Sequence, residues 1–302
     1  MTQEPTVHFL LEPDLRKAAQ AGAHPFIAKM ALVLESASFR VAYRDHGDTD
    51  RSPETYTLGH MKVPPSQRGL IFRRVYEYPF WQIEGSAERW EWDAAKARFD
   101  PALVSDQDAT PFYAFWQKRL YQDAPSRTSR EGFIYVPLQG RLRDHRSFQS
   151  CSPLEMIEQC LAHDPSRQVV ATIHPNEVYS DAEIAALEAL ERKHKRLCVD
   201  VGNMVPLLQG CDYVVTQNSS VAYAGYFFGK PALLFGKIDF HHIAVQADMD
   251  NLAHSFAQAA EATPDYAKYL YWFWQDQSIN AGRDDVYAKI TARFRRFGWP
   301  ID

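Results

Sequence analysis

The stretch from Cys211 to Gly236, CDYVVTQNSSVAYAGYFFGKPALLFG, constrains the fold of this chain more than any other segment. Its two short apolar runs, Tyr213–Thr216 and Ala232–Phe235, have the length of buried strands. Between them, Asn and Ser residues of the kind that cap helices precede an apolar segment, which Gly229 and then Pro231 end. The pattern predicts a strand–helix–strand crossover, the building unit of a parallel sheet.

The second part of the chain, from Gly132 onward, alternates predicted strands with capped helical segments. Such alternation is typical of a parallel, doubly wound sheet with helices on its faces. Besides the crossover, we expect strands at Phe133–Leu138, Gln168–Ile173 and Leu197–Val201, and helices at Pro153–Leu161, Asp181–His194 and Met204–Gln209. Three further helical stretches, near Asn251–Glu261, Pro264–Gln275 and Asp284–Arg296, close the chain.

The first part of the chain is less regular. We expect a strand at Val7–Leu11, a helix at about His24–Glu35 and a strand at Phe39–Tyr43, whereas Leu70–Ile83 has no assignable period. The polar segment Gln122–Arg130, QDAPSRTSR, has the composition of a linker. The sequence therefore predicts one α/β domain over residues 1–130 and a second over residues 131–302.

Composition excludes several classes of protein. The net charge of −5 and the pI near 6.1 disfavour a general nucleic-acid binder. The N-terminus, MTQEPTVHFL, has Glu and Pro where a secretory signal needs basic residues, and no apolar window is long enough for a transmembrane helix. The four cysteines form no CxxC pair. We therefore expect a cytoplasmic protein with reduced thiols.

Polar residues follow three of the predicted strands. They are Gln139 to Asp144, QGRLRD, after the first, His174 and Pro175 after the second, and Asn218, Ser219 and Ser220 after the third. The carboxyl ends of the strands in an open parallel sheet border one crevice, so these groups are expected to share a site. Backbone N–H groups at a helix N-terminus, with two serine hydroxyls beside them, favour an anion there.

Each cluster also has a purely structural interpretation. Asn218 or Ser219 could merely cap the helix, and His174 could be a structural histidine before a turn. Asp144, which is flanked by Arg141 and Arg143, could be a solvated loop carboxylate in an ion-pair network. The convergence of an acid, an imidazole and paired hydroxyls at three strand ends favours a shared anion-binding site.

The order of these motifs resembles the capsular polysaccharide synthesis family, which includes bacterial β-Kdo glycosyltransferases. The similarity is carried by VPLQ with Asp144 downstream, then IHP, then QNSSVAYAGYFFGKPALLFG, and it covers about residues 133–236 with a weak extension into Leu270–Trp274. The HP and Ser-rich elements are also similar to those that hold CMP in bacterial sialyltransferases. The resemblance implies a GT-B-like α/β fold: two Rossmann-like domains with parallel sheets that face a cleft, and C-terminal helices that return to the first domain.

The resemblance also implies roles for individual residues. Asp144 would be the catalytic carboxylate, either a nucleophile that forms a glycosyl-enzyme or a base on the acceptor hydroxyl. The nucleotide-binding set would comprise Gln139, Arg141, His174, Pro175, Asn218, Ser219 and Ser220. No cofactor is expected besides the CMP-sugar donor. Neither is a metal, because the sequence has no DxD and no clustered His/Cys ligand set.

The sequence departs from the family pattern at two points. Family members carry a Lys shortly before HP, where this chain has Thr172 and Ile173, so that Arg141 or Arg143 would have to replace it as a phosphate partner. Family members also carry Glu-Ala-Leu in the helix after the serines, where this chain has Ala222–Tyr226, AYAGY. The missing Glu weakens the expectation of ribose or cytosine recognition.

We expect a metal-independent glycosyltransferase that moves an acidic, Kdo-like sugar from a CMP-activated donor to a surface or capsular glycan or glycolipid. The second domain would bind the donor and the first the acceptor. One alternative is a UDP-sugar-dependent GT-B transferase or epimerase, because a fold does not determine a reaction. Another is a catalytically inactive glycan- or nucleotide-binding relative, which the two departures favour.

The C-terminal segment Lys289–Trp299, KITARFRRFGW, alternates arginines with aromatic residues. One hypothesis is peripheral contact with an anionic inner membrane, where lipid-linked acceptors reside. The alternative is a last helix that packs its aromatic side chains on the core and leaves its arginines in water.

Overall fold

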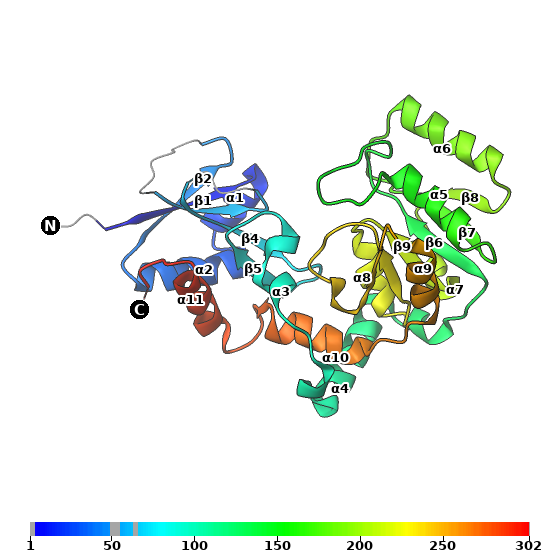
Figure 1. The fold of residues 1–302 in the computed structure, drawn as a ribbon. Coiled ribbons are helices and arrows are strands. Elements are labelled where there is room, and N and C mark those ends of the chain that lie inside the picture. The colour runs from blue at the N-terminus through cyan, green and yellow to red at the C-terminus, as the bar shows by residue number, and fades with distance from the viewer. Residues whose placement is uncertain (1–3, 49–54, 63–65, 302) are drawn as a thin grey trace. The chain divides into compact units, whose positions relative to one another are not determined.

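The computed structural model describes residues 4–48, 55–62 and 66–301, and the chain divides into two compact units (Figure 1). Unit 1 comprises Met1–Ala97 and Trp272–Asp302, and unit 2 comprises Arg98–Tyr271. Each unit is built on one six-stranded sheet. The chain thus starts unit 1, builds the whole of unit 2, and then returns to unit 1.

Unit 2 contains the parallel sheet that the sequence predicts. Its strands are β6 (Phe133–Pro137), β7 (Gln168–Ile173), β8 (Leu197–Val201), β9 (Tyr213–Thr216), β10 (Ala232–Leu234) and β11 (Val245–Gln246). They lie in the order β11-β10-β9-β6-β7-β8, and every pairing is parallel. This is the 3-2-1-4-5-6 order of dinucleotide-binding folds, in which the order of strands reverses between β6 and β9.

Helices cover both faces of the unit 2 sheet. On one face, α5 (Pro153–His163), α6 (Asp181–Lys193) and α9 (Leu252–Glu261) share a buried core with β6, β7, β9 and β10. That core includes Tyr213 and Val215 of β9, so Val214 points to the opposite face. There α8 (Ser220–Tyr226) packs closely, because a Cβ on its Gly225 would lie 3.5 Å from Val214 and 3.4 Å from Leu208 of α7 (Met204–Gly210).

Unit 1 has a mixed sheet in the order β12-β5-β4-β3-β1-β2. Its strands are β1 (Thr6–Leu11), β2 (Arg40–Asp45), β3 (Tyr56–His60), β4 (Arg68–Arg74), β5 (Phe80–Glu84) and β12 (Ile279–Asn280), and its helices are α1 (Pro13–Gln20), α2 (Pro25–Ser36), α3 (Asp93–Lys96) and α11 (Val286–Arg296). The strands β1 to β4 are parallel, whereas β5 and β12 are antiparallel to their neighbours. The predicted parallel sheet is present in β1 to β4, and β5 joins it as an antiparallel strand because the turn after β4 is too short for a parallel crossover.

The prediction that C-terminal helices return to the first unit is confirmed for α11. Its Val286, Ile290 and Phe294 are buried in the same core as β1, β3 and α2. Its Arg293 donates to the carboxylates of Glu84 at 2.5 Å and Asp93 at 2.8 Å. The other two closing helices, α9 and α10 (Tyr266–Tyr271), belong to unit 2.

The compact units differ from the predicted division at residue 130. The helix α4 (Asp106–Tyr121) belongs to unit 2, where Tyr113 Oη donates to the carbonyl of Tyr226 at 2.8 Å. The segment with linker composition is held in unit 2 as well, because buried Lys230 donates from Nζ to the carbonyls of Ser129 and Cys211. Polar and Pro-containing composition at 122–130 therefore marks a 3₁₀ turn on the surface of unit 2 and not a hinge.

Two of the three aromatic residues of the C-terminal segment lie in the core of unit 1. Phe294 is fully buried, Trp299 is 4% exposed, and their rings stack with centroids 4.8 Å apart. Core packing thus accounts for two of the three aromatic side chains on which the membrane-contact hypothesis depends, and the third, Phe297, is partly buried against the same core. Within the described residues, no helix is long and apolar enough to cross a bilayer.

Candidate functional site

The predicted site residues lie at the carboxyl edge of the unit 2 sheet, on the loops after β6, β7 and β9. Hydrogen bonds tie two of these strand ends together. Thr216 Oγ1 donates to the carbonyl of Pro137 at 3.2 Å and accepts from the backbone N–H of Ser219 at 3.3 Å. The ends of β6 and β9 flank the point where the strand order reverses, which is where ligands bind in sheets of this topology.

Asp144 and Arg141 form an ion pair in the loop after β6. Arg141 Nε donates to Asp144 Oδ2 at 2.6 Å, and the Asp144 N–H donates to the Arg141 carbonyl at 3.1 Å. Arg141 has a positive φ of 67°, a strained conformation for a residue with a side chain. The Asp144 side chain keeps 47% of its surface exposed, so it can still contact a ligand.

The loop after β6 is fastened to the N-terminus of α6. Ser180 caps this helix in a capping box with Glu183, and Glu183 Oε1 also accepts from the backbone N–H of Leu142 at 2.5 Å. Hydrogen bonds from Ser180 and from this loop hold the pKa of Glu183 below its usual range. The result is a shallow pocket of about 440 Å³ lined by Arg141, Arg143, Asp144, Ser180, Ala182 and Glu183.

His174 follows β7 and is exposed. Its ring Nδ1 accepts from the backbone N–H of Asn176 at 3.2 Å, and its own backbone N–H donates to Tyr179 Oη at 2.9 Å. Because Nδ1 accepts, the neutral ring carries its proton on Nε2, which is available as a donor to an anion. The exposed Pro175 follows at the start of the turn.

The two serines after β9 differ in their surroundings. Ser219 is 5% exposed, and its hydroxyl oxygen caps α8 by accepting from the backbone N–H of Val221 at 3.3 Å. Ser220 is exposed, and Asn218 is half-buried. The helix itself ends at Tyr226, two residues earlier than the sequence predicts. Ser219 therefore has the structural role of a cap, and Ser220 is the serine with a free surface.

The structure brings some of the predicted residues together and leaves others apart. The loops after β6 and β7 touch, since a Cβ on Gly140 would lie 2.8 Å from Glu177 Oε2, three residues after His174. Gln139 is half-buried between these loops. Within the described ranges, no hydrogen bond or ion pair joins His174 or Ser220 to Asp144. The predicted residues thus share one edge of the sheet, where Arg141 contacts Asp144, whereas His174 and Ser220 form no hydrogen bond or ion pair with Asp144 among the described residues.

The sequence analysis missed the loop after β10. It passes close to the end of β9, because a Cβ on Gly236 would lie 2.9 Å from the carbonyl of Gln217. It carries the exposed Lys237 and a pair of stacked histidines, His241 and His242, with ring centroids 4.3 Å apart. The signal that marked the other loops, polar residues directly after a predicted strand, is also present here, because GKIDFHH follows the predicted strand Ala232–Phe235.

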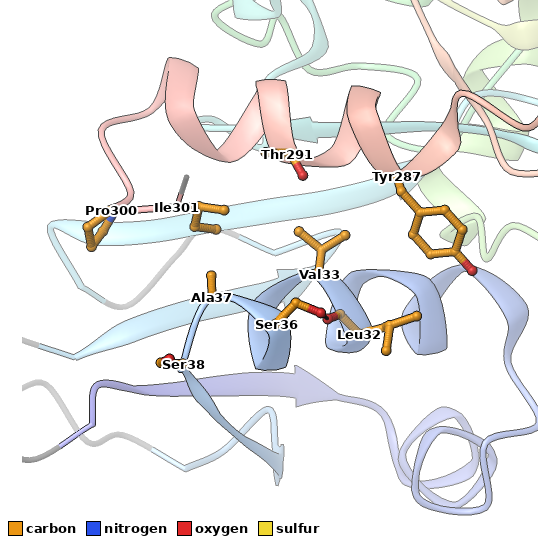
Figure 2. Close-up of a pocket in the computed structure, with 9 residues that line it drawn as sticks. All are labelled: Leu32, Val33, Ser36, Ala37, Ser38, Tyr287, Thr291, Pro300 and Ile301. Carbon is orange, nitrogen blue, oxygen red and sulfur yellow. Dashed lines mark hydrogen bonds between the residues drawn. The ribbon is translucent and has the colours of Figure 1, made fainter.

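A second pocket, of about 620 Å³, lies in unit 1 between α2 and α11 (Figure 2). Its lining is made of aliphatic and hydroxyl side chains, namely Leu32, Val33, Ser36, Ala37, Ser38, Tyr287, Thr291, Pro300 and Ile301. This pocket is larger than the one beside Asp144, but its lining has no carboxylate, imidazole or cation with which to carry out chemistry.

No family model and no curated protein matches the sequence. Among solved structures, the chain is similar to KpsC of Thermosulfurimonas dismutans, a β-Kdo 2,7 transferase, with 10% identity and a TM-score of 0.51 over 88% of this chain and 89% of that chain. The KpsC β-Kdo 2,4 transferase of the same organism has 13% identity and a TM-score of 0.45 over 90% and 99% of the two chains. At such identities the first likeness concerns the fold alone. This chain therefore has the GT-B-like α/β fold that its sequence predicts, and it shares that fold with the KpsC β-Kdo 2,7 transferase.

Proposed function

We propose that this protein is a glycosyltransferase that moves a Kdo-like acidic sugar from a CMP-activated donor to a surface glycan or glycolipid. The observation that carries the proposal is the placement of Asp144, His174 and Ser220 on loops at the carboxyl edge of the unit 2 sheet, after β6, β7 and β9, where β6 and β9 flank the point at which the strand order reverses. The shared fold with a β-Kdo transferase and the motif resemblance support it. Metal independence and the identity of the donor are parts of the proposal.

The charges at this edge suit a nucleoside monophosphate leaving group. Negative charge grows on the phosphate as the sugar bond breaks, and fixed donors placed there lower the barrier. His174 offers Nε2–H, Ser220 offers a hydroxyl, and exposed cations stand on two neighbouring loops. Those cations, Arg143 after β6 and Lys237 after β10, are candidates to replace the Lys that the family carries before HP.

Asp144 is the candidate for the chemical step. Its carboxylate lines the pocket beside α6, and Arg141 at 2.6 Å neutralises part of its charge. In a reaction through a glycosyl-enzyme it would attack the anomeric carbon as CMP leaves. In a single displacement it would take the proton of the acceptor hydroxyl.

A nucleotide screen by thermal shift tests the proposal. CMP at 100 times its dissociation constant should stabilise the protein by about 2.7 kcal/mol, and UDP and GDP should give smaller shifts. The variant Arg143→Ala should reduce the shift with CMP. Arg192→Ala is the matched control, because Arg192 is an exposed arginine in the last turn of α6 that pairs with Glu188 at 3.4 Å. A shift with UDP alone would favour the UDP-sugar alternative, and no shift with any nucleotide would contradict the proposal.

An inactive nucleotide-binding relative is the second candidate function. Two observations favour it: the Lys before HP is absent, and α8 has AYAGY where family members have Glu-Ala-Leu. Incubation with CMP-Kdo separates the two candidates, because the relative would bind CMP without releasing it from the sugar. Release of CMP above the rate of a heat-inactivated sample excludes the inactive relative.

A further inference from the structure

Two buried glutamines, Gln149 and Gln217, lie on adjoining segments at the carboxyl edge of the unit 2 sheet. Gln217 directly follows β9, and Gln149 forms an antiparallel bridge with Gly236 in the loop after β10. The segments meet at Gly236, because a Cβ on that residue would lie 2.9 Å from the carbonyl of Gln217. Gln149 is 6% exposed and Gln217 is 4% exposed. Both amides are therefore buried beside the point where the strand order reverses.

One end of each side-chain amide is bonded to the protein, which fixes its orientation. Gln149 Oε1 accepts from the backbone N–H of Arg146 at 2.8 Å, and Gln217 Nε2 donates to the carbonyl of Cys151 at 2.9 Å. The other ends, Gln149 Nε2 and Gln217 Oε1, are buried and have no hydrogen-bond partner among the residues that the structure describes. Unpartnered polar atoms are rare in protein interiors, because they lose their bonds to water. The two amides thus leave one donor and one acceptor for a ligand.

The backbone around the two amides is held by hydrogen bonds between the loops. The Ser150 N–H donates to the carbonyl of Phe235 at 2.7 Å, and the Lys237 N–H donates to the carbonyl of Phe148 at 2.9 Å. The carbonyl of Gln149 lies 2.7 Å from the Nε2 atom of His145. The free amide ends therefore have preset positions, as the recognition of a planar group requires.

An aromatic face lies beside the amides. The ring of the half-buried Phe148 would lie 3.3 Å from a Cβ on Gly236, and the Arg146 guanidinium is stacked over that ring at 4.8 Å. The free amide ends are shielded from solvent, so a base reaches them only when neighbouring side chains move. A nucleobase can replace a guanidinium on an aromatic face, because both groups are planar and stack there.

Arg146 connects the amides with the candidate donor site. Its backbone N–H holds Gln149, and its guanidinium is close enough to Arg141, Asp144 and Glu177 to interact with their charges. Burial and Arg141 lower the pKa of Arg146, whereas the two carboxylates oppose this shift. Its Nε is buried without a hydrogen-bond partner in the described part of the chain. A phosphate near Arg146 would supply both a hydrogen-bond acceptor and a compensating charge.

We propose that Gln149 and Gln217 select the base of the donor nucleotide by pairing with the edge of cytosine. The inference rests on the proposed function and names the residues that choose its nucleotide. Gln217 Oε1 accepts from the exocyclic 4-amino group, and Gln149 Nε2 donates to ring N3. Cytosine carries this donor and this acceptor on adjacent ring atoms. The base stacks on Phe148 in place of the Arg146 guanidinium.

Uracil in the same position would reverse both hydrogen bonds. Its O4 would face Gln217 Oε1, and its N3–H would face Gln149 Nε2, so that acceptor meets acceptor and donor meets donor. Rotation of the amides does not relieve this mismatch, because Arg146 and Cys151 hold their other ends. A well-formed pair of such contacts discriminates against the wrong base by about 10- to 100-fold.

A buried water molecule is the other partner that a free donor and a free acceptor suggest. In that role the glutamines would contribute to stability and not to the choice of base. Their replacement would then lower the melting temperature and leave the ratio of the CMP and UMP affinities unchanged. The two interpretations therefore differ in a measurable ratio.

Calorimetry on the wild-type protein tests the hydrogen bonds from the side of the ligand. The three ligands are CMP, UMP and 3-deaza-CMP, which keeps the 4-amino group but has C–H in place of N3. CMP should bind about 10- to 100-fold more tightly than UMP, and 3-deaza-CMP should also bind more weakly than CMP. This measurement needs no variant, so it does not depend on how a substitution affects folding.

The variants Gln149→Met and Gln217→Met test each glutamine separately, because Met keeps the length of the side chain and removes both polar ends. Gln149→Met should bind CMP and 3-deaza-CMP equally, since the partner of N3 is gone. Gln217→Met should still prefer CMP to 3-deaza-CMP but should lose much of its preference for CMP over UMP. The matched control is Gln168→Met, which changes an exposed glutamine at the start of β7 and should keep the wild-type ratios.

The outcomes separate failure of this inference from failure of the proposed function. Equal affinity of the wild-type protein for CMP, UMP and 3-deaza-CMP, or tighter binding of UMP, would overturn the base assignment. Unchanged affinity ratios in folded Gln149→Met and Gln217→Met would also overturn it and leave the glutamines a structural role. If the wild-type protein bound none of the three nucleotides, the proposed function would be overturned, and the base assignment with it.

Discussion

Replacement of Arg293 by Met should destabilise unit 1 strongly at pH 8 and much less at pH 5. Arg293 joins α11 to the sheet by donating to Glu84, Asp93 and the carbonyl of Ile83. The Glu84 side chain is only 3% exposed, and burial raises its pKa to about 7 even though Arg293 opposes the shift. The charge on Glu84 is thus tolerated in the folded state because the guanidinium is beside it.

The magnitude follows from the raised pKa of Glu84. A rise from 4.5 to about 7 is worth about 3.4 kcal/mol, at about 1.36 kcal/mol for each pKa unit. Since the folded-state pKa is raised, this stabilisation is complete below pH 4.5 and is lost as the pH rises through 7. Without Arg293 the ionised carboxylate has no buried partner, so the loss at pH 8 should be about 3–5 kcal/mol. At pH 5 the variant loses the contacts with neutral Glu84 and the Ile83 carbonyl and the pair with the partly exposed Asp93, at about 1–3 kcal/mol in total.

Urea unfolding followed by tryptophan fluorescence measures the effect, because all the tryptophans except Trp116 belong to unit 1. The control Arg296→Met removes a more exposed arginine that also pairs with Asp93, at 3.4 Å, and should cost at most about 1 kcal/mol at either pH. Glu84→Gln should abolish the part of the pH dependence that comes from this carboxyl. An equal loss at pH 5 and pH 8 in Arg293→Met, or an unchanged pH profile in Glu84→Gln, would refute the reasoning.

Three further predictions concern unit 2. Asp144→Asn should leave CMP affinity nearly unchanged in calorimetry while lowering turnover of CMP-Kdo by several orders of magnitude, the pattern of an interaction used mainly in the transition state; near-normal turnover would place the catalytic carboxylate elsewhere. Ser219→Ala should lower the free energy of unfolding by about 1 kcal/mol, because α8 loses its cap. Ser220→Ala should instead weaken CMP binding and leave the stability unchanged. Equal CMP affinity in the wild-type protein and in Ser220→Ala would contradict a ligand role for the exposed serine. Maleimide at pH 7 should label Cys198 alone in the folded protein, because the other three thiols are buried. Burial also raises the pKa of Cys151 to about 11 and that of Cys211 to about 12. Rapid labelling of a second cysteine, measured by intact-mass spectrometry, would contradict this burial.

The regular part of unit 2 could be predicted because each of its elements carries its own local signal. Ser152 and Ser180 begin helices by capping boxes, and the apolar runs between the helices match β6 to β10 to within one or two residues. The switch point follows from the order of those elements together with the rules of parallel sheets. The local signal offered Asn218 or Ser219 as the cap of α8 but could not choose between them, because the burial of Ser219 and its contact with the hydroxyl of Thr216 are set by the fold.

Unit 1 was less predictable because its contacts join residues far apart in the sequence and because one of its turns lacks the residue types that usually mark a turn. The segment Leu70–Ile83 has no single period, since it contains parts of two strands and a reversal in which Tyr76 takes a positive φ of 65°, a position where Gly or Asn would have marked the turn. The side-chain hydrogen bond between Glu12 and His60 joins residues that lie 48 positions apart in the sequence, and only the pairing of β1 with β3 brings the two together. No spacing pattern encodes such a pair.

The discontinuity of unit 1 sets the order in which the protein can mature on the ribosome. Most of the first sheet is made before unit 2, but its edge strand β12 and the buried face of α11 belong to 272–301, which is synthesised after the whole of unit 2. Unit 2 is continuous, so its sheet can form while the first sheet still lacks its final strand and helix. Domains usually fold from the N-terminus onward during synthesis, and here the sequence of events is inverted. Unit 1 is thus begun before unit 2 and completed after it, so the apolar surface that α11 covers stays uncovered while unit 2 is made.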